Sequence, residues 1–336
     1  MKSLADRALE LVNIASPSRE EDAIVEHVRG LMPQAPAYDH DTVLYYPGRV
    51  VLAGHYDTVP AQDNFPGRVE GGWVVGLGAT DMKGGLAVMI ELARAGAPFG
   101  YLFFGREELP AGESSLPTFF ERHGLDADLV VMLEPTDNTI QAGCLGNLNA
   151  RLVFHGTSAH SARPWLGDNA IMRAVEELAP LARLDPLDVE IQGLVFREVL
   201  SVTQIEGGIA TNVIPALATA TLNFRYAPSR TPEEAEARLH DLVDGAGDLE
   251  LLGNSPPGRV AAVSPLVQAL RGAGDFALEP KQAWTPVAEF SAQGLDAVNL
   301  GPGATRYAHT RDERVEIAEL ERTYDALLKF AATVTG

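Results

Sequence analysis

The hydrophobic and polar positions of the chain follow one pattern up to about residue 148. Short apolar runs alternate with stretches whose apolar residues recur at helical spacing. The runs predict buried strands, and the stretches between them predict amphipathic helices. Strands separated by helices indicate an α/β sheet that is covered on both faces. The expected strands are residues 49–55, 101–108 and 128–135, and the expected helices are residues 81–96 and 114–124.

From residue 149 the strands have mixed or alternating polarity, which is typical of a sheet with one solvated face. Strands are expected at residues 149–156, 201–207, 218–226 and 248–253, with helices at residues 168–182 and 231–245. The order β-α-β-β-α-β is that of a ferredoxin-like unit. The α/β pattern then resumes, with helices at 264–274 and 317–334 and a strand at 296–302. We therefore expect an α/β domain in two parts, 1–148 and 259–336, with an α+β domain inserted at 149–258.

Two expected helices begin with a capping-box pattern, in which a hydroxyl residue is followed three positions later by glutamate. Ser18 and Glu21 precede the apolar face of a helix that extends to Met32. Thr231 and Glu234 begin the second helix of the inserted domain. The pattern predicts that both hydroxyl groups cap the helices that follow them.

The composition excludes several classes of protein. The 336 residues are 46% hydrophobic, which suffices for two cores, and the net charge of -20 argues against nucleic acid or an anionic membrane as a partner. Cys144 is the only cysteine, so a reducing compartment is permitted. Charged residues interrupt the N-terminal apolar positions, and the uncharged run 207–224 contains Asn212 and Pro215. We expect neither a signal peptide nor a membrane span, and hence a cytoplasmic protein.

Acidic and histidine side chains gather where the predicted strands end. His55 and Asp57 follow the first strand, an adjacent glutamate pair the second and Glu134 the third, while Asp81 precedes a helix. In open α/β sheets this edge is where ligands bind. Carboxylates crowded together raise one another's pKa, so a positive partner is required. Histidine and carboxylate ligands suit zinc, with cobalt or manganese as substitutes, and the number of ligands favours two ions bridged by Asp81.

Each of these residues also has a simpler interpretation. Asp57 and Asp81 can cap a turn and a helix, Glu107 and Glu108 can begin a charged loop, Glu134 can be a solvated strand end, and His160 and His309 can be ordinary surface residues. The stretch "GLGATDMKGG" resembles a dinucleotide-binding loop, but Asp81 stands where the third glycine is required. We therefore do not expect a nucleotide there.

Six motifs together resemble the M20 family of metal-dependent peptidases and aminoacylases. They are "GHYDTVP", "GLGATDMKGG", "REE", "EPT", "GTSAHSARPWLGDNAI" and "AHTRDE". Within the family, "NVIPALATATLNFRYAPSR" and "AWTPVAEFSAQGLDAVNLGPG" are most similar to the actinobacterial type of succinyl-diaminopimelate desuccinylase. The resemblance implies a zinc aminopeptidase-like catalytic domain, with a mixed sheet between helices, and a ferredoxin-like inserted domain that serves as lid and dimerisation surface. It also implies a homodimer.

The same resemblance implies roles for the metal ligands. His55 and Glu134 would hold one zinc ion, Glu108 and His309 the other, and Asp81 would bridge them.

It also implies roles for residues around the metals. Asp57 would orient the His55 imidazole, and Glu107 would act as the general base. Glu107 and Glu108 would point in opposite directions because adjacent residues of an extended chain do so. His160 would reach the partner subunit's active site and stabilise the oxyanion. The substrate contacts implied are Asn212, Arg225, Arg163 and Thr285.

The implied reaction is hydrolysis of N-succinyl-LL-2,6-diaminopimelate to LL-2,6-diaminopimelate and succinate, in lysine and diaminopimelate biosynthesis. Cys144 stands where some family members have an arginine that contacts the succinyl group, and Pro286 replaces an aspartate common in similar relatives. These departures leave open another M20 deacylase or peptidase, such as acetylornithine deacetylase, a hydrolase that releases lysine from a carrier protein, or a dipeptidase. A catalytically silent metal-binding relative is the remaining alternative.

Overall fold

The structure is a computed structural model that describes residues 2–334, and the chain divides into two compact units. Unit 1 comprises Met1–Gly143, Arg259–Glu279 and Glu289–Gly336, and unit 2 comprises Cys144–Gly258 and Pro280–Ala288. Unit 2 thus contains the range 149–258 expected for the inserted domain, together with a short segment from later in the chain. In the range that the structure describes, no helix is both long and apolar enough to cross a bilayer.

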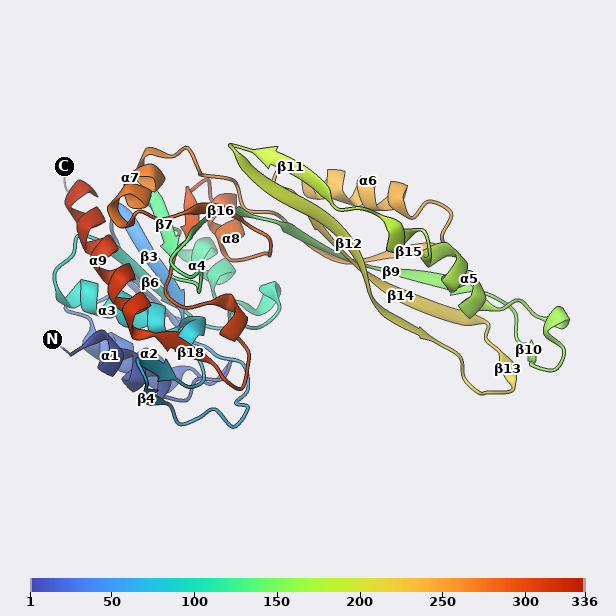
Figure 1. Cartoon of the computed structure of the whole chain (residues 1–336), viewed down its shortest axis with the longest axis horizontal. Coiled ribbons are helices and arrows are strands. Elements are labelled where there is room, and N and C mark those ends of the chain that lie inside the picture. Colours follow the sequence, from blue (N-terminus) through green and yellow to red (C-terminus); the bar gives the residue numbers. More distant parts are fainter. Residues whose placement is uncertain (1, 335–336) are drawn as a thin grey trace. The chain divides into compact units, whose positions relative to one another are not determined.

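An eight-stranded mixed sheet forms the centre of unit 1 (Figure 1), as the sequence predicts for the α/β part of the chain. Its strands are β1 (Tyr38–His40), β2 (Val43–Tyr46), β6 (Gly100–Phe104), β3 (Val50–His55), β7 (Leu129–Met132), β17 (Ala297–Asn299), β8 (Ile140–Cys144) and β16 (Leu278–Lys281), in that spatial order. Strands β6, β3, β7 and β17 run parallel to one another, and β2 and β8 pair antiparallel with the outer members of this group. Every residue of β3 is buried, because a central parallel strand is covered on both faces.

Helices cover both faces of this sheet. They are α1 (Leu4–Val12), α2 (Asp22–Leu31), α3 (Gly84–Arg94), α4 (Leu116–Arg122), α7 (Pro265–Gly274), α8 (Val287–Ala292) and α9 (Ile317–Val334). Helix α3 lies against the sheet and also packs on α1 and α9, so its residues from Gly84 to Ala93 are all buried. On the other face, Phe119 of α4 packs edge-on against Tyr45 of β2. A small sheet of β4 (Arg68–Glu70), β5 (Trp73–Val75) and β18 (Arg314–Glu316) flanks this core.

Unit 2 is built on an antiparallel sheet of five strands. In spatial order they are β11 (Leu187–Ile191), β12 (Leu194–Gly207), β14 (Leu217–Tyr226), β9 (Gly146–His155) and β15 (Asp248–Ser255). Helices α5 (Ala170–Leu178) and α6 (Pro232–Leu242) join them, and β10 (Ala159–His160) pairs with β13 (Val213–Ile214). Without β11, the chain and strand orders are those of the predicted ferredoxin-like fold.

The two faces of this sheet differ in polarity. Residues of β14 alternate between buried and half-buried, which is the period-2 pattern expected for one covered face. Leu222 and Phe224 point into a core with α5 and α6. Asn223 and Arg225 therefore point to the opposite face.

The two predicted capping boxes have different outcomes. Thr231 accepts a hydrogen bond from the Glu234 N–H at 3.2 Å, and the Glu234 carboxylate accepts one from the Thr231 N–H at 2.9 Å, so this box is confirmed. The box at Ser18 is wrong, because α2 begins only at Asp22 and no side chain caps it. The side chains of Ser18 and Glu21 bind elsewhere.

Candidate metal centre

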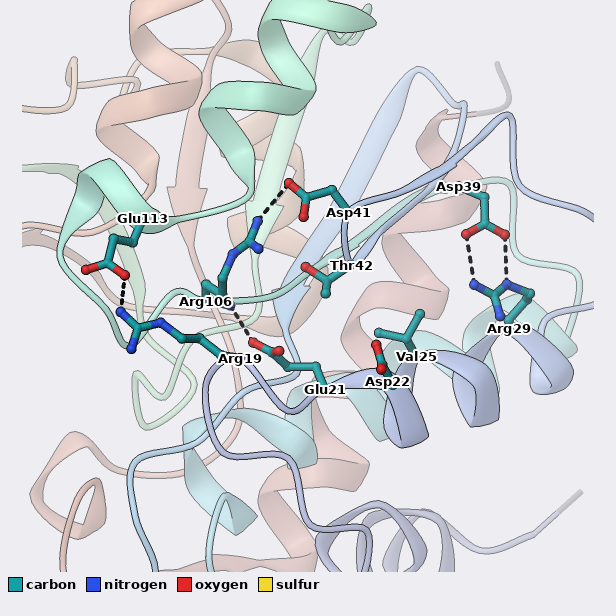
Figure 2. Close-up of a pocket in the computed structure, with 10 residues that line it drawn as sticks. All are labelled: Arg19, Glu21, Asp22, Val25, Arg29, Asp39, Asp41, Thr42, Arg106 and Glu113. Carbon is teal, nitrogen blue, oxygen red and sulfur yellow. Dashed lines mark hydrogen bonds and ion pairs between the residues drawn. The ribbon is translucent and has the colours of Figure 1, made fainter.

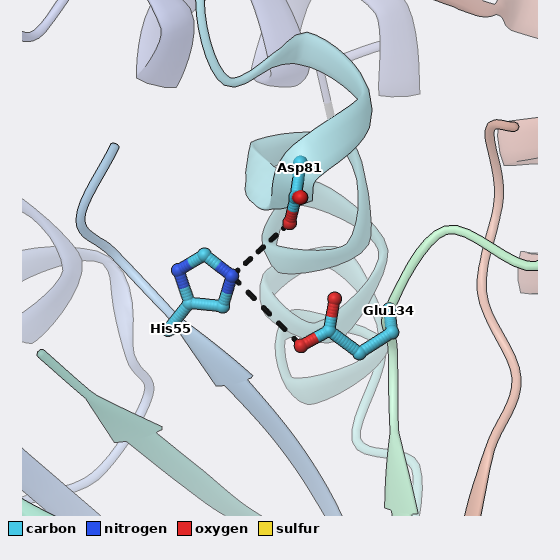
Figure 3. Close-up of side chains that lie close together, drawn as sticks. All are labelled: His55, Asp81 and Glu134. Atoms are coloured by element: carbon cyan, nitrogen blue, oxygen red, sulfur yellow. Dashed lines mark hydrogen bonds and ion pairs between the residues drawn. The ribbon is translucent and has the colours of Figure 1, made fainter. Parts of the chain in front are cut away.

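Three candidate ligands meet at the carboxyl ends of β3 and β7 (Figure 3). His55 is the last residue of β3, and its Nε2 lies 3.2 Å from Asp81 Oδ1 and 3.9 Å from Glu134 Oε1. Glu134 follows the end of β7 by two residues. His55 and Glu134 are both buried. The parallel pairing of β3 with β7 brings their ends to the same edge of the sheet, as the sequence predicts.

A second group of candidate ligands shares Asp81 with the first. His309 Nε2 lies 3.0 Å from Glu108 Oε1 and 3.5 Å from Asp81 Oδ2. Asp81 thus presents Oδ1 to His55 and Oδ2 to His309. In each group the candidate ligand atoms lie within 4.8 Å of one another. One carboxylate that serves both groups through different oxygens is the arrangement expected of a bridging ligand.

Glu313 holds the backbone that carries Asp81. Its Oε1 accepts hydrogen bonds from the N–H groups of Thr80, at 3.2 Å, and Asp81, at 3.0 Å. Glu313 is 1% exposed, and burial raises its pKa to about 7. It comes four residues after His309, so one short segment supplies a candidate ligand and also supports the backbone of Asp81. In the same turn, the buried Lys83 donates from Nζ to the Ile14 carbonyl at 2.7 Å.

Glu107 and Glu108 lie in a turn, which corrects the expectation of an extended chain. Strand β6 ends at Phe104, and Arg106 has a left-handed backbone with φ of 60°. The Asp57 carboxylate accepts hydrogen bonds from the Glu107 N–H at 3.0 Å and from the Glu108 N–H at 3.1 Å. The turn, and not the alternation of a strand, sets the directions of the two glutamates.

Asp57 also lies beside the His55 ring. His55 Nδ1 is 3.1 Å from the Asp57 carbonyl oxygen and 3.4 Å from its Oδ1. Both contacts favour a proton on Nδ1, which leaves Nε2 directed at Asp81 and Glu134. Asp57 therefore joins the strand end that bears His55 to the turn that bears Glu107 and Glu108.

The crowding of carboxylates dominates the electrostatics of this centre. Burial acts to lower the pKa of His55, but hydrogen bonds to Asp57 and Asp81 raise it well above its usual value. Asp81 and Glu108 raise the pKa of His309 to about 10. Burial raises the pKa of Glu107 well above its usual range, against the opposing effect of His55. These shifts all follow from negative charge gathered in one place, which a bound cation would stabilise.

The donor set fits two divalent metal ions. Each group offers imidazole and carboxylate donors, the ligand types of zinc and related metals. A metal ion requires the neutral imidazole and the ionised carboxylate, so its charge would displace the protons that the cluster otherwise retains. His55, Asp81 and Glu134 are suited to hold one ion, and Asp81, Glu108 and His309 the other.

The residues of unit 2 that the sequence implicates in catalysis or substrate binding do not form one cluster. Pairing of β10 with β13 aligns His160 with Val213, and Ser161 N–H donates to the Asn212 carbonyl at 2.9 Å, so His160 and Asn212 are neighbours. Arg163 is in the same loop and donates from its N–H to the His160 carbonyl at 2.8 Å. These three residues are exposed. Figure 1 shows β10 and β13 beyond the end of β14 at which that strand begins.

Arg225 lies near the opposite end of β14. It lies eight positions after Leu217, the first residue of β14, which corresponds to about 27 Å in an extended strand. Arg225 is half-buried and donates from Nε to Asn223 Oδ1 at 2.9 Å. It forms no ion pair within residues 2–334.

Thr285, the remaining candidate contact, is buried, and its carbonyl oxygen lies 3.7 Å from Cys144 Sγ.

The sequence analysis missed the residues that hold the ligand-bearing loops. Glu313 was within a recognised motif, "AHTRDE", but nothing in its spacing showed that it binds the backbone around Asp81. Ser18 and Glu21 were interpreted as helix caps. The sequence showed only a polar pair before a helix. This pattern is the same whether the side chains cap the helix or bind a distant turn.

These features define a class of protein, the metal-dependent hydrolases of amide bonds whose metal centre lies at the carboxyl edge of a mixed sheet. The chain belongs to peptidase family M20/M25/M40, whose model matches residues 51–333. A succinyl-diaminopimelate desuccinylase of Corynebacterium glutamicum is 37% identical over 338 residues, covering 92% of this chain and 91% of the relative. A Mycobacterium tuberculosis protein, which carries the same name provisionally, is 38% identical over 337 residues and 95% of both chains.

Solved structures show the same fold at low sequence identity. An aminopeptidase of Bacillus cereus superposes with a TM-score of 0.81 at 18% identity, over 99% of this chain and 98% of that one. A Bacillus subtilis protein described as a dinuclear metal-binding peptidase of the M20 family has a TM-score of 0.67 at 15% identity, over 98% and 97% of the two chains. The predicted family, fold class and enzyme class are thereby confirmed.

A close backbone contact generates a prediction about the first group of ligands. A Cβ atom on Gly301 would lie 2.3 Å from the Leu133 carbonyl oxygen and 2.5 Å from that of Glu134. Gly301→Ala should therefore displace Glu134 and weaken the binding of one divalent metal ion by roughly 10- to 100-fold, the effect of disturbing residues that support metal ligands. Competition with a chromophoric chelator measures this affinity. Gly272→Ala, in α7 with nothing within 4 Å of the added atom, is the control, and equal metal affinities in the two variants would contradict the prediction.

Proposed function

We propose that the protein removes the succinyl group from N-succinyl-LL-2,6-diaminopimelate, giving LL-2,6-diaminopimelate and succinate. The main support is the identity of 37–38% to desuccinylase-named relatives over nearly the whole chain. The two candidate ligand groups that share Asp81 support the hydrolytic chemistry. The substrate is thus a small N-acyl amino acid, and the reaction is the hydrolysis of one amide bond.

We propose zinc in both positions, with cobalt or manganese as substitutes. The imidazole nitrogens of His55 and His309 and the oxygens of Asp81, Glu108 and Glu134 would be the ligands. Bound metal polarises the amide carbonyl and makes water acidic enough to attack at neutral pH. Oxygen-only ligand sets favour magnesium or calcium, whereas the histidine in each group favours zinc.

Glu107 is the proposed general base. Its carboxylate takes the proton of the attacking water, and the resulting acid delivers that proton to the leaving nitrogen. Loss of solvation and the neighbouring carboxylates raise the pKa of the half-buried Glu107, which suits a group that must both accept and donate a proton near neutral pH. Asp57 keeps the backbone of Glu107 in place through the hydrogen bond described above.

Arg225 is the proposed contact for a carboxylate of the substrate. Burial lowers the pKa of Arg225, yet guanidinium remains charged in proteins, so a half-buried arginine without an ion pair seeks an anionic partner. Asn223 accepts a hydrogen bond from its Nε, and its two terminal nitrogens have no hydrogen-bond partner within residues 2–334, so they can bind a carboxylate through parallel hydrogen bonds. Asn212, Arg163 and Thr285 remain proposed contacts for the rest of the substrate.

We further propose a homodimer in which unit 2 supplies His160 to the partner's active site. A molecule the size of an N-acyl amino acid cannot contact both Arg225 and His160 of one unit 2, since most of the length of β14 lies between them. A second copy can supply the missing residue. The edge of β12 beyond Glu198 has no strand partner within residues 2–334, and Val202 and Ile205 are exposed along it. Such an edge is suited to pairing with a second copy.

The general base is tested by Glu107→Gln. The variant should bind two zinc ions like the unmodified protein, because Glu107 is in neither ligand group, but kcat should fall by at least ~10²-fold because proton transfer is lost. Metal analysis and steady-state kinetics measure the two quantities. Glu121→Gln, an exposed glutamate of α4, is the control. Loss of a zinc ion, or near-normal kcat, would show that the roles of Glu107 and Glu108 are wrongly assigned.

The substrate is tested by comparing acyl groups. The unmodified enzyme should prefer N-succinyl-LL-diaminopimelate to N-acetylornithine, N-acetyl-lysine and dipeptides. Arg225→Lys keeps a charge but loses the planar fork, so kcat/KM for the succinyl substrate should fall at least ~10-fold, on the order of 1.4 kcal/mol. Arg151→Lys, an arginine on β9 that pairs with Glu250, is the matched control. Equal or better turnover of the acetyl substrates would reject the desuccinylase and leave another M20 deacylase.

The dimer is tested by mixing two inactive variants, His160→Ala and Glu107→Gln. If His160 acts in the partner's site, each mixed dimer contains one site free of both substitutions. Random exchange of equal amounts should then restore up to about a quarter of the unmodified activity, because half of the dimers are mixed. Exchange is verified with differently tagged subunits. Absence of any recovery after verified exchange would place the action of His160 in its own chain or exclude it.

A further inference from the structure

The segment from Ser18 to Glu21 makes contacts that neither a helix cap nor the proposed reaction explains. Glu21 is the N-cap residue of α2, but its side chain makes no capping hydrogen bond. The Ser18 hydroxyl donates to Asp57 Oδ2 at 2.7 Å. The Glu21 carboxylate accepts through Oε1 from the Arg106 N–H at 3.1 Å, and it is 2% exposed. Both side chains therefore bind groups next to the Glu107–Glu108 turn.

These contacts complete a series of three backbone hydrogen bonds. The Arg106 N–H donates to Glu21 Oε1, the Glu107 N–H to Asp57 Oδ1 and the Glu108 N–H to Asp57 Oδ2. Three consecutive amides are thus held by two buried carboxylates, from segments 50 to 85 residues away in the sequence. Hydrogen bonds to an ionised acceptor are shorter and stronger than neutral ones.

The surroundings leave this turn little freedom. Arg106 has a left-handed backbone, and its Nη2 donates to Asp41 Oδ2 at 2.8 Å (Figure 2). A Cβ atom on Gly105 would lie 2.7 Å from Thr42 Oγ1 and 3.1 Å from Glu21 Oε1. Glu21 thus fills the space directly against the turn. On its other side, Glu21 and Arg106 line a cavity of about 710 Å³, which leaves room for smaller side chains and water at position 21.

We propose that Ser18 and Glu21 are positioning residues that fix where the Glu107 and Glu108 carboxylates lie. Glu21 accepts the hydrogen bond of the first amide of the turn, that of Arg106. Ser18 donates to the Asp57 carboxylate, which accepts from the next two amides of the turn. Neither residue belongs to a candidate ligand group. The inference rests on the proposed roles of Glu107 as base and Glu108 as metal ligand. A shift of about 1 Å in a reacting group can lower the rate by about 10²-fold, so such support matters to the reaction.

The acceptor oxygen of Glu21, and not its charge, is the feature that the proposal requires. Glu21→Gln retains an amide oxygen that can accept from the Arg106 N–H, whereas Glu21→Ala removes the acceptor and lets unfixed water take its place. Ser18→Ala removes the hydroxyl donor to Asp57. The chain offers matched controls. Ser3, the cap of α1, donates to Asp6 Oδ2 at the same distance of 2.7 Å, and Glu20 is the exposed neighbour of Glu21.

The experiment measures zinc affinity, kcat and KM per folded zinc-loaded enzyme, and the melting temperature of each variant. For Glu21→Ala and Ser18→Ala we expect kcat to fall at least ~10-fold with KM changed less than about 2-fold, because the base is displaced while substrate contacts remain. The affinity for one of the two zinc ions should also fall, because Glu108 moves with the turn. Glu21→Gln should recover most of both losses, and Ser3→Ala and Glu20→Ala should match the unmodified protein in kcat and zinc affinity.

Three outcomes would overturn the proposal. The first is an unchanged kcat and zinc affinity in Glu21→Ala. The second is a lower melting temperature with normal kcat, which would make the contacts merely stabilising. The third is an equal loss in Glu21→Gln and Glu21→Ala. If Glu21→Ala does not fold, Ser18→Ala, whose side chain is only partly buried, decides alone. If the unmodified protein hydrolyses no N-acyl substrate, the proposed function fails, and the zinc titration still decides the positioning.

Discussion

The repulsion among carboxylates around Asp81 is the constraint on which the rest of the structure depends. Asp81, Glu107, Glu108 and Glu134 lie in one cluster, and the carboxylates that hold the ligand-bearing backbone, such as Asp57 and Glu313, add to it. Buried carboxylates cannot all be ionised without nearby positive charge. The cations of the turns do not meet this need, since burial lowers the pKa of Lys83 to about 7 and Arg106 is paired with Asp41. Two divalent ions would supply four positive charges at the place where the negative charge is greatest.

The same constraint explains how the ligands are held. A backbone N–H can stabilise a carboxylate without adding a titratable group, and the centre uses this solution repeatedly. Glu313 accepts from the turn of Asp81, and Asp57 accepts from the turn of Glu107 and Glu108. In these hydrogen bonds the backbone N–H groups donate to the supporting carboxylates, so the side chains of Asp81 and Glu108 are left to face the candidate metal positions. Each ligand-bearing turn is thereby tied to a distant segment, and the geometry of the centre depends on the tertiary fold.

This dependence decides what could be predicted from the sequence. His55 and Glu134 come at the ends of apolar runs that predict strands. The carboxyl ends of parallel strands lie at one edge of a sheet, so the convergence of these two side chains was predictable. The turn at Glu107 was not, because the three amides that shape it bond to side chains far away in the sequence. Ser18 shows the limit most clearly. Its local pattern matches a helix cap as well as Thr231 does, but a buried carboxylate within reach competes for its hydroxyl. Local spacing cannot show which partner the fold will supply.

Unit 2 presents the opposite case, in which strand alternation carries most of the information. Alternation along β14 predicted that one face is covered and the other solvated, and the core that contains Leu222 and Phe224 confirms it. What alternation cannot show is how polar residues bond across strands. Asn223 donates to Asn147 Oδ1 at 2.6 Å and to Asn149 Oδ1 at 2.8 Å, which fixes its amide so that its oxygen faces Arg225. A chain with a net charge of -20 repels an anionic substrate at long range, so recognition must come from short-range contacts of this kind. Arg225 is oriented by the neutral amide of Asn223 and pairs with no carboxylate within residues 2–334, so its charge is available for a short-range contact with an anion.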